Sequence, residues 1–136
     1  MEFTIEEYRI ADAGEILPLY QAVGWTSYTD RPEMLARAFR GSLLVLAARS
    51  GEELLGLIRV VGDGASILYI QDLLVFPEHQ GKGVGTALVK AIQERYSHVY
   101  QKCLVTEHSE QYVEFYQKLG FRAVGDLGCC ALMKHY

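Results

Sequence analysis

The chain has 136 residues, of which half are hydrophobic and 22% are charged, and its formal net charge is −4. This length fits one domain, over residues 1–136, and the composition is that of a globular protein rather than a disordered one. The negative charge argues against a nucleic-acid-binding surface. No apolar run is long enough to span a bilayer, and the N-terminus lacks the basic and apolar regions of a signal peptide, so we expect a cytoplasmic protein without membrane contacts.

Two helices are predicted between the first strand and the second. Residues 4–10 are predicted to form the first strand. Residues 12–15, Asp-Ala-Gly-Glu, have the pattern of a capping box and predict a helix that ends at Gly24. Residues 30–33, Asp-Arg-Pro-Glu, place an acidic cap before a first-turn proline and predict a second helix that ends at Gly41.

Three strands follow these helices. Residues 42–48 and 54–61 have strand-like composition and are joined by a turn at residues 50–53. Asp63-Gly64 is a strong hairpin signal before the next run, residues 67–76. Because short turns join antiparallel neighbours, the sequence predicts three antiparallel strands in a row.

The last third of the chain alternates helices and strands. A helix that begins near Val84 has apolar residues at helical spacing on one face, and a short strand is predicted at residues 102–106. Ser109 is the expected N-cap of a further helix, with Gly120 just past its end. Final strands are predicted at residues 122–125 and 130–135. The order β-α-α-β-β-β-α-β-α-β-β predicts a mixed α/β fold.

The turn before the helix near Val84 is the most informative segment of the chain. It reads Gln80-Gly81-Lys82-Gly83-Val84-Gly85 and follows the apolar strand Leu73-Leu74-Val75-Phe76. Glycines let a ligand approach the backbone, and the first N–H groups of a helix have no internal acceptors. Together with Lys82, the helix N-terminus favours an anion, so we expect a phosphorylated cofactor here.

Two common phosphate loops do not fit this turn. A Walker A loop needs a Ser or Thr after Gly-Lys, but Gly83 follows Gly81-Lys82. A Rossmann fingerprint needs the spacing G-x-G-x-x-G and an acidic residue about 20 positions later. Here the spacing is G-x-G-x-G, and Val105 stands about where the acid should be.

The turn resembles the pyrophosphate loop of the GNAT superfamily of acetyl-CoA-dependent N-acetyltransferases, Gln/Arg-x-x-Gly-x-Gly/Ala. The strand before it ends in Leu73-Leu74-Val75-Phe76-Pro77, which is similar to the apolar-x-Val-x-Pro entry of that family. Phe115-Tyr116-Gln117-Lys118-Leu119-Gly120-Phe121 matches a second motif of the family on a later helix. Two motifs in this order are far more specific than either one alone.

The resemblance implies a fold, a cofactor and the residues that bind it. The fold would be a central mixed, mostly antiparallel sheet flanked by about four helices, and the cofactor acetyl-CoA, with CoA as product. The main chain of residues 73–75 would lie along the pantetheine arm, and the amides of residues 81–86 would surround the pyrophosphate. The implied cofactor-binding residues are Leu73, Leu74, Val75, Gln80, Gly81, Lys82, Gly83, Val84, Gly85, Thr86 and Ser109. Ser109 stands where many family members have Asn.

The catalytic candidates are Tyr116 and Asp72. By resemblance Tyr116 protonates the CoA thiolate, although an aromatic residue at helical spacing otherwise belongs to a core. Asp72 is the first candidate for the base that deprotonates the amine, because a charged residue inside the apolar run 67–76 must face a functional site or form a buried pair. Glu107 and His108 are reserve candidates, and bulk solvent is the remaining alternative.

Three residues are candidates for binding the acceptor. Trp25 and Tyr28 lie in the segment that usually recognises the acceptor in the family and could form an aromatic wall; Trp25 could equally pack under a loop. Arg59 could bind an acceptor carboxylate or pair with an acid. The acceptor would be a small-molecule or peptide amine that the sequence does not name.

No metal is expected. Cys103, Cys129 and Cys130 have no metal-ligand spacing, and adjacent cysteines rarely pair with each other, so we expect reduced thiols. The four histidines form no H-x-x-H pattern. A terminal strand at residues 130–135 could pair across a homodimer.

The sequence therefore predicts an N-acetyltransferase that transfers an acetyl group from acetyl-CoA to a primary amine by direct attack in a ternary complex. The alternative is a non-catalytic CoA-binding regulatory module, which Ser109 and the unproven base leave open. A purely structural or interaction protein ranks third, because it gives the glycines of the turn no purpose.

Overall fold

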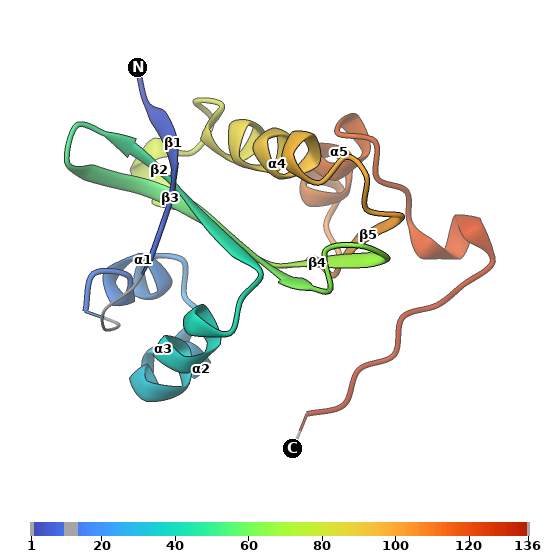
Figure 1. Ribbon diagram of the computed structural model, residues 1–136, viewed down its shortest axis with the longest axis horizontal. Coiled ribbons are helices and arrows are strands. Elements are labelled where there is room, and N and C mark those ends of the chain that lie inside the picture. Colours follow the sequence, from blue (N-terminus) through green and yellow to red (C-terminus); the bar gives the residue numbers. More distant parts are fainter. Residues whose placement is uncertain (1, 10–13, 136) are drawn as a thin grey trace. The chain divides into compact units, whose positions relative to one another are not determined.

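The computed structural model describes residues 2–9 and 14–135 (Figure 1). They form two compact units, one ending at Leu104 and one beginning at Val105, and the single domain expected from the sequence stays a prediction. The first unit contains β1 (Thr4–Glu7), α1 (Leu17–Ala22), α2 (Thr26–Thr29), α3 (Pro32–Arg40), β2 (Leu44–Ser50), β3 (Glu53–Gly62), β4 (Ile67–Val75), the 3-10 helix η1 (Pro77–His79), α4 (Val84–Arg95) and β5 (Gln101–Leu104). The second contains α5 (Glu110–Lys118) and the 3-10 helix η2 (Val124–Leu127).

The five strands of the first unit form one mixed sheet. Their order is β1-β2-β3-β4-β5; the first four strands are antiparallel to their neighbours, and β5 is parallel to β4. A parallel neighbour needs a crossover connection, which α4 supplies between β4 and β5. This sheet and its helices confirm the predicted mixed, mostly antiparallel α/β fold.

Helices cover both faces of the sheet. Figure 1 shows α1, α2 and α3 on one side and α4 on the other. On the first side, Tyr20 and Phe39 form a core with Leu57 and Leu74 of the sheet. On the second side α4 packs against the strands with its buried residues Val84, Leu88, Val89 and Ile92. The central strand β3 is buried from Leu55 through Val60, as a strand covered on both faces must be.

The helix starts differ in detail from the predicted ones. Helix α1 has Ile16 as its N-cap without a side-chain hydrogen bond, and Asp12 and Ala13 of the predicted capping box lie outside the described residues. Helix α3 has Pro32 in its first turn as predicted, but the prediction of Asp30 as its cap is wrong. Asp30 instead closes α2, a single turn that the sequence did not predict, because its N–H donates to the Thr26 carbonyl at 3.0 Å.

The prediction of two final strands, at residues 122–125 and 130–135, is wrong. Residues Val124–Leu127 form η2, and no described residue after it belongs to a strand. The apolar character of this segment suggested strands, but a strand needs a neighbouring backbone, and no strand of the described chain pairs with it. Leu132 is 92% exposed, so its side chain gains no burial.

Candidate functional site

A β-bulge interrupts the pairing of β3 with β4. Arg59 lies opposite Asp72, but its neighbour Val60 lies opposite Ile70, so Gln71 is an extra residue on β4. Such a bulge reverses which face of the sheet receives each alternate side chain. The burial pattern of β4 gives no sign of it, because the buried positions alternate without a break.

The bulge sends consecutive parts of β4 to opposite faces. Ile70 shares a face with Val60, on the side that α4 covers, whereas Asp72 and Leu74 share the face of Arg59 and the α1–α3 core. The polar pair Gln71-Asp72 is thereby directed toward the helices that carry Tyr20 and Tyr28. The hydrogen bonds of both side chains to these tyrosines agree with this placement.

Strand β5 accompanies β4 only as far as the bulge. Their pairing covers residues 67–70 and ends with Ile70 opposite Leu104. In the described residues no strand lies on this side of residues 71–75. The predicted pantetheine-binding residues Leu73, Leu74 and Val75 therefore form an open strand edge in the middle of the sheet, and such an edge can pair with a ligand's amides.

Asp72 and Arg59 form a buried ion pair. Arg59 Nε donates to Asp72 Oδ2 at 2.7 Å, and the Tyr20 hydroxyl donates to the same oxygen at 2.7 Å. Only 1% of Asp72 and 5% of Arg59 is exposed, so neither side chain faces an open surface. Asp72 Oδ1 is buried and accepts no hydrogen bond from the described residues. The sequence left open whether these residues act on the substrate or pair; the structure pairs them with each other.

The rest of the Arg59 guanidinium reaches the end of α3. Its Nη1 lies 3.2 Å from Ser42 Oγ and 3.4 Å from the Ala38 carbonyl, and the Phe39 ring centroid lies 5.6 Å from Cζ. Burial lowers the pKa of Arg59, but the charge of Asp72 outweighs this effect and the pKa is raised. Burial, followed by the charge of Asp72, raises the pKa of Tyr20. Arg59 thus stays charged and Tyr20 stays a hydrogen-bond donor at any physiological pH.

The aromatic candidates lie together above this pair. The Trp25 and Tyr28 rings stack with centroids 6.0 Å apart, and the ring centroids of Tyr28 and Tyr20 are 5.3 Å apart. The Tyr28 hydroxyl accepts a hydrogen bond from Gln71 Nε2 at 3.1 Å. Trp25 is 37% exposed, so it packs on the tyrosines and still presents part of its ring to solvent.

The glycine turn holds the backbone in conformations that other residues avoid. Gly81 and Gly83 have φ of +77° and +86°, and a Cβ at either position would meet no atom within 4 Å. The requirement is therefore conformational, and the space beside these residues is open. Gln80 Nε2 donates to the Val75 carbonyl at 3.0 Å and closes the turn onto the end of β4.

Helix α4 begins directly after Gly83 and has no acidic residue in its first turn. Its first main-chain bond runs from the Ala87 N–H to the Gly83 carbonyl, so the N–H groups of residues 84–86 have no acceptor within the helix. Lys82 and Lys90 are exposed nearby, whereas His79 lies 3.2 Å from Glu53. This donor set suits a pyrophosphate.

Helix α5, in the second unit, is built as the sequence predicts. Ser109 is its N-cap and accepts from the Tyr112 N–H at 3.3 Å. At its end the Phe121 N–H donates to the Tyr116 carbonyl at 3.1 Å and Gly120 has φ of +98°, which is a Schellman motif. Its hydrophobic clasp places the Phe121 ring edge-on to Tyr116, with centroids 5.8 Å apart.

Burial raises the pKa of Tyr116 to about 12. Its phenol therefore keeps its proton at neutral pH and can act as a donor. Glu107 and His108, the reserve candidates for the base, precede α5 and are exposed.

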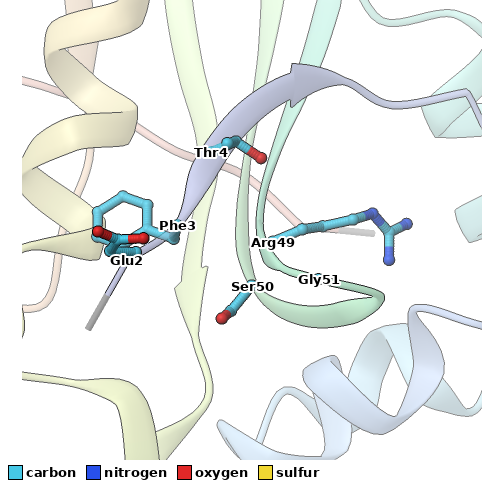
Figure 2. A pocket seen from close by; sticks show the side chains of 6 residues that line it. All are labelled: Glu2, Phe3, Thr4, Arg49, Ser50 and Gly51. Carbon is cyan, nitrogen blue, oxygen red and sulfur yellow. The ribbon is translucent and has the colours of Figure 1, made fainter.

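A separate pocket of about 570 Å³ contains none of the predicted site residues. Figure 2 shows its lining, which comes from the start of β1 and the turn between β2 and β3. The Arg49 guanidinium there binds Glu6 at 2.8 Å and Glu15 at 2.9 Å. Within residues 2–9 and 14–135, no cluster of three or more His, Cys, Asp or Glu side chains could hold a metal, and no helix could cross a bilayer.

Known proteins are similar to this chain in both sequence and fold. The model of the acetyltransferase (GNAT) domain matches residues 11–135. A GNAT-family acetyltransferase structure from Streptococcus pneumoniae TIGR4 is 37% identical, with a TM-score of 0.89, over 99% of this chain and 98% of that one. A histone acetyltransferase from Glycine max is 31% identical over 88% of this chain and 58% of its own length. The chain spans little more than half the length of such curated relatives.

A more distant structure is similar in fold. It is the PaiA N-acetyltransferase from Thermoplasma acidophilum in complex with coenzyme A, which is 19% identical, with a TM-score of 0.75, over 90% of this chain and 91% of that one. The family match covers nearly the whole sequence. The chain belongs to the GNAT acetyltransferase family.

Proposed function

We propose that this chain is an N-acetyltransferase that transfers the acetyl group of acetyl-CoA to a primary amine by direct attack in a ternary complex. The observation that carries the proposal is the open edge of β4 at residues 73–75, which leads through the glycine turn into the N-terminus of α4. A strand edge offers N–H and C=O groups to the amides of pantetheine, and the acid-free helix start offers N–H groups to a pyrophosphate. The residues present therefore fit the cofactor.

The proposed roles divide the reaction among a few groups. Bound acetyl-CoA supplies the acetyl group as an activated thioester. The main-chain N–H near Val75 donates to the carbonyl oxygen as charge develops on it. A C–N bond forms as the C–S bond breaks, the acylated nitrogen releases its extra proton to solvent, and Tyr116 donates its proton to the departing sulfur and regains one from solvent. Gln80, Ser109 and the amides of residues 81–86 hold the cofactor.

The acceptor nitrogen must lose a proton before it attacks, because an amine is mostly ammonium at neutral pH. Asp72 as the base stays a prediction, and its geometry is unfavourable: Oδ2 already accepts two hydrogen bonds, and Oδ1 is enclosed. We therefore propose that water takes this proton. Glu107 and His108 remain the alternatives.

For the acceptor, we propose that Trp25 and Tyr28 form one wall of its binding site. The exposed part of the Trp25 ring and the hydrogen bond between Gln71 and Tyr28 give this surface an aromatic face beside a polar rim. Since Arg59 is paired with Asp72, it is left out of the proposed acceptor site. One relative is a histone acetyltransferase from Glycine max, so peptide amines belong in an acceptor screen beside small amines.

Two experiments test the proposal. Titration calorimetry measures the binding of CoA. An assay with acetyl-CoA then measures the release of free thiol in the presence of small amines, polyamines, aminoglycosides or peptide N-termini. We expect CoA binding and thiol release that depends on one class of amine. Thermal stabilisation by CoA without release across the panel would favour the second candidate, a CoA-binding regulatory module, for which Ser109 in place of Asn is the specific observation. Absence of CoA binding would refute both.

A further inference from the structure

The bulge at Gln71 lies where the open edge of β4 begins. Pairing with β5 stops at Ile70, one residue before the bulge, and the open stretch begins just after it. A bulge leaves one residue without its hydrogen bonds to the neighbouring strand. Two long antiparallel strands are therefore expected to pair without a bulge unless another interaction favours it. Some side chain must therefore favour the shifted register.

Asp72 supplies that preference. If the pairing of Val60 with Ile70 continued without a bulge, Gln71 would lie opposite Arg59, and Asp72 would turn to the face covered by the apolar side of α4. There its carboxylate would lose the ion pair with Arg59 and be buried without a partner. The free-energy cost of such a buried charge is far larger than that of one strand residue left out of the backbone pairing. The ion pair thus selects the bulged register over the regular one.

The pair is itself fixed from several elements. Tyr20 on α1 donates to Asp72 Oδ2, and the guanidinium of Arg59 reaches Ser42 and the Ala38 carbonyl at the end of α3. The neighbouring bulge residue Gln71 is bonded to Tyr28 on α2. Both polar residues of the bulge are therefore anchored to helices on one face of the sheet.

We propose that Tyr20, Arg59 and Asp72 are positioning residues that hold the bulge at Gln71 and thereby keep the β4 edge at residues 73–75 open for the cofactor. This inference rests on the proposed function for the identity of the ligand. In this proposal Asp72 acts by holding the main chain of β4 in place, and it does not take the proton of the amine.

The decisive variant replaces the pair by apolar residues of similar size, Arg59→Met with Asp72→Leu. Such replacements of buried ion pairs are often neutral or stabilising, so the protein should still fold. We expect the melting temperature to change little, while the Kd for CoA rises roughly 10-fold and the amide-exchange pattern across residues 71–75 departs from that of the wild type. Arg49→Met is the matched control, because it removes an arginine bound to two acids on the same sheet and should change neither CoA affinity nor exchange in β4.

Two further variants keep the test decisive if the double variant does not fold. Tyr20→Phe removes one hydrogen bond and keeps the ring, and it should weaken CoA binding in the same direction. Asp72→Asn keeps the shape of the side chain, and its pH–rate profile should keep the shape of the wild-type profile. A profile that loses its acidic limb while CoA affinity is unchanged would make Asp72 the base and overturn the proposal.

The proposal is also overturned if the folded double variant or Tyr20→Phe shows wild-type CoA affinity and wild-type exchange at residues 71–75. If the wild type itself fails to bind CoA, the proposed function is refuted. The exchange measurement, made without ligand, then still decides whether the pair holds the bulge.

Discussion

The hydroxyl of Tyr116 is protonated at neutral pH and can therefore donate a proton to the departing thiolate. Burial raises its pKa to about 12, and its ring is held edge-on by both Phe115 and Phe121. Tyr116→Phe removes the proton and keeps the ring contacts. We expect kcat to fall by about 10²- to 10⁴-fold, as for the loss of a positioned acid, with no change in CoA affinity.

Steady-state kinetics and CoA calorimetry on the same preparation check this expectation. The pH profile adds a second observable: because the phenol loses its proton only near pH 12, the rate should not decline on the alkaline side below about pH 10. Tyr112→Phe, on the exposed part of the same helix, is the control. Wild-type kcat in the Tyr116 variant would remove this residue from catalysis.

Asp63 gives a residue-scale prediction about stability. Its carboxylate accepts from Ser66 Oγ and from the N–H groups of Ala65, Ser66 and Ile67, and these bonds lower its pKa. A lowered pKa in the folded state means that the carboxylate contributes stability above its unfolded pKa of about 3.9 and loses it as the pH falls through the folded value.

Asp63→Asn should therefore lower the melting temperature at pH 7. In acid, where the wild-type carboxylate is protonated, the melting temperatures of the wild type and the variant should differ less. Thermal melts from pH 2 to pH 7 measure both effects. A constant difference between the two proteins over this range would show that the charge of Asp63 does not support the turn between β3 and β4.

Among the elements, the glycine turn before α4 allows two effects of a substitution to be separated: the effect of backbone strain on stability and the effect on CoA binding. Gly83 has φ of +86° with open space beside it, and Gly51, in the turn between β2 and β3, has φ of +61° with equally open space. Alanine at either position should cost about 1–2 kcal/mol of folding free energy, because both backbones are left-handed.

Only Gly83→Ala should also weaken CoA binding, because Gly83 alone adjoins the first turn of α4. Matched melts and CoA titrations of Gly83→Ala and Gly51→Ala make the comparison. Equal CoA affinity in the two variants would mean that the N-terminus of α4 does not bind the pyrophosphate.

Elements with local signals were predicted well, and those that depend on distant partners were not. Helix α5 follows from Ser109, Gly120 and Phe121, which lie within a few residues of the ends that they fix. The bulge at Gln71 depends on Arg59, in another strand, and no spacing in the sequence reveals that register. For the same reason the sequence identified Asp72 as exceptional but did not choose between a base and a buried pair.

At the scale of the whole molecule, the unexpected segment is residues 130–135. The sequence predicted a strand here, and possible pairing across a homodimer stays a prediction, but the described chain provides it with no neighbouring strand. Leu132 and Met133 are 92% and 64% exposed, so these side chains gain little burial. Surface positions of this kind usually tolerate substitution within about 0.5 kcal/mol.

Leu132→Lys should accordingly leave the melting temperature and the molecular mass in solution unchanged, because an exposed side chain has no apolar contact to lose. Leu68→Lys, at a fully buried position of β4, is the contrasting control and should prevent folding. Differential scanning calorimetry and light scattering on the same samples give both quantities. A lower melting temperature together with a halved mass would show that this segment pairs across a dimer, and the burial gained there would explain its apolar sequence.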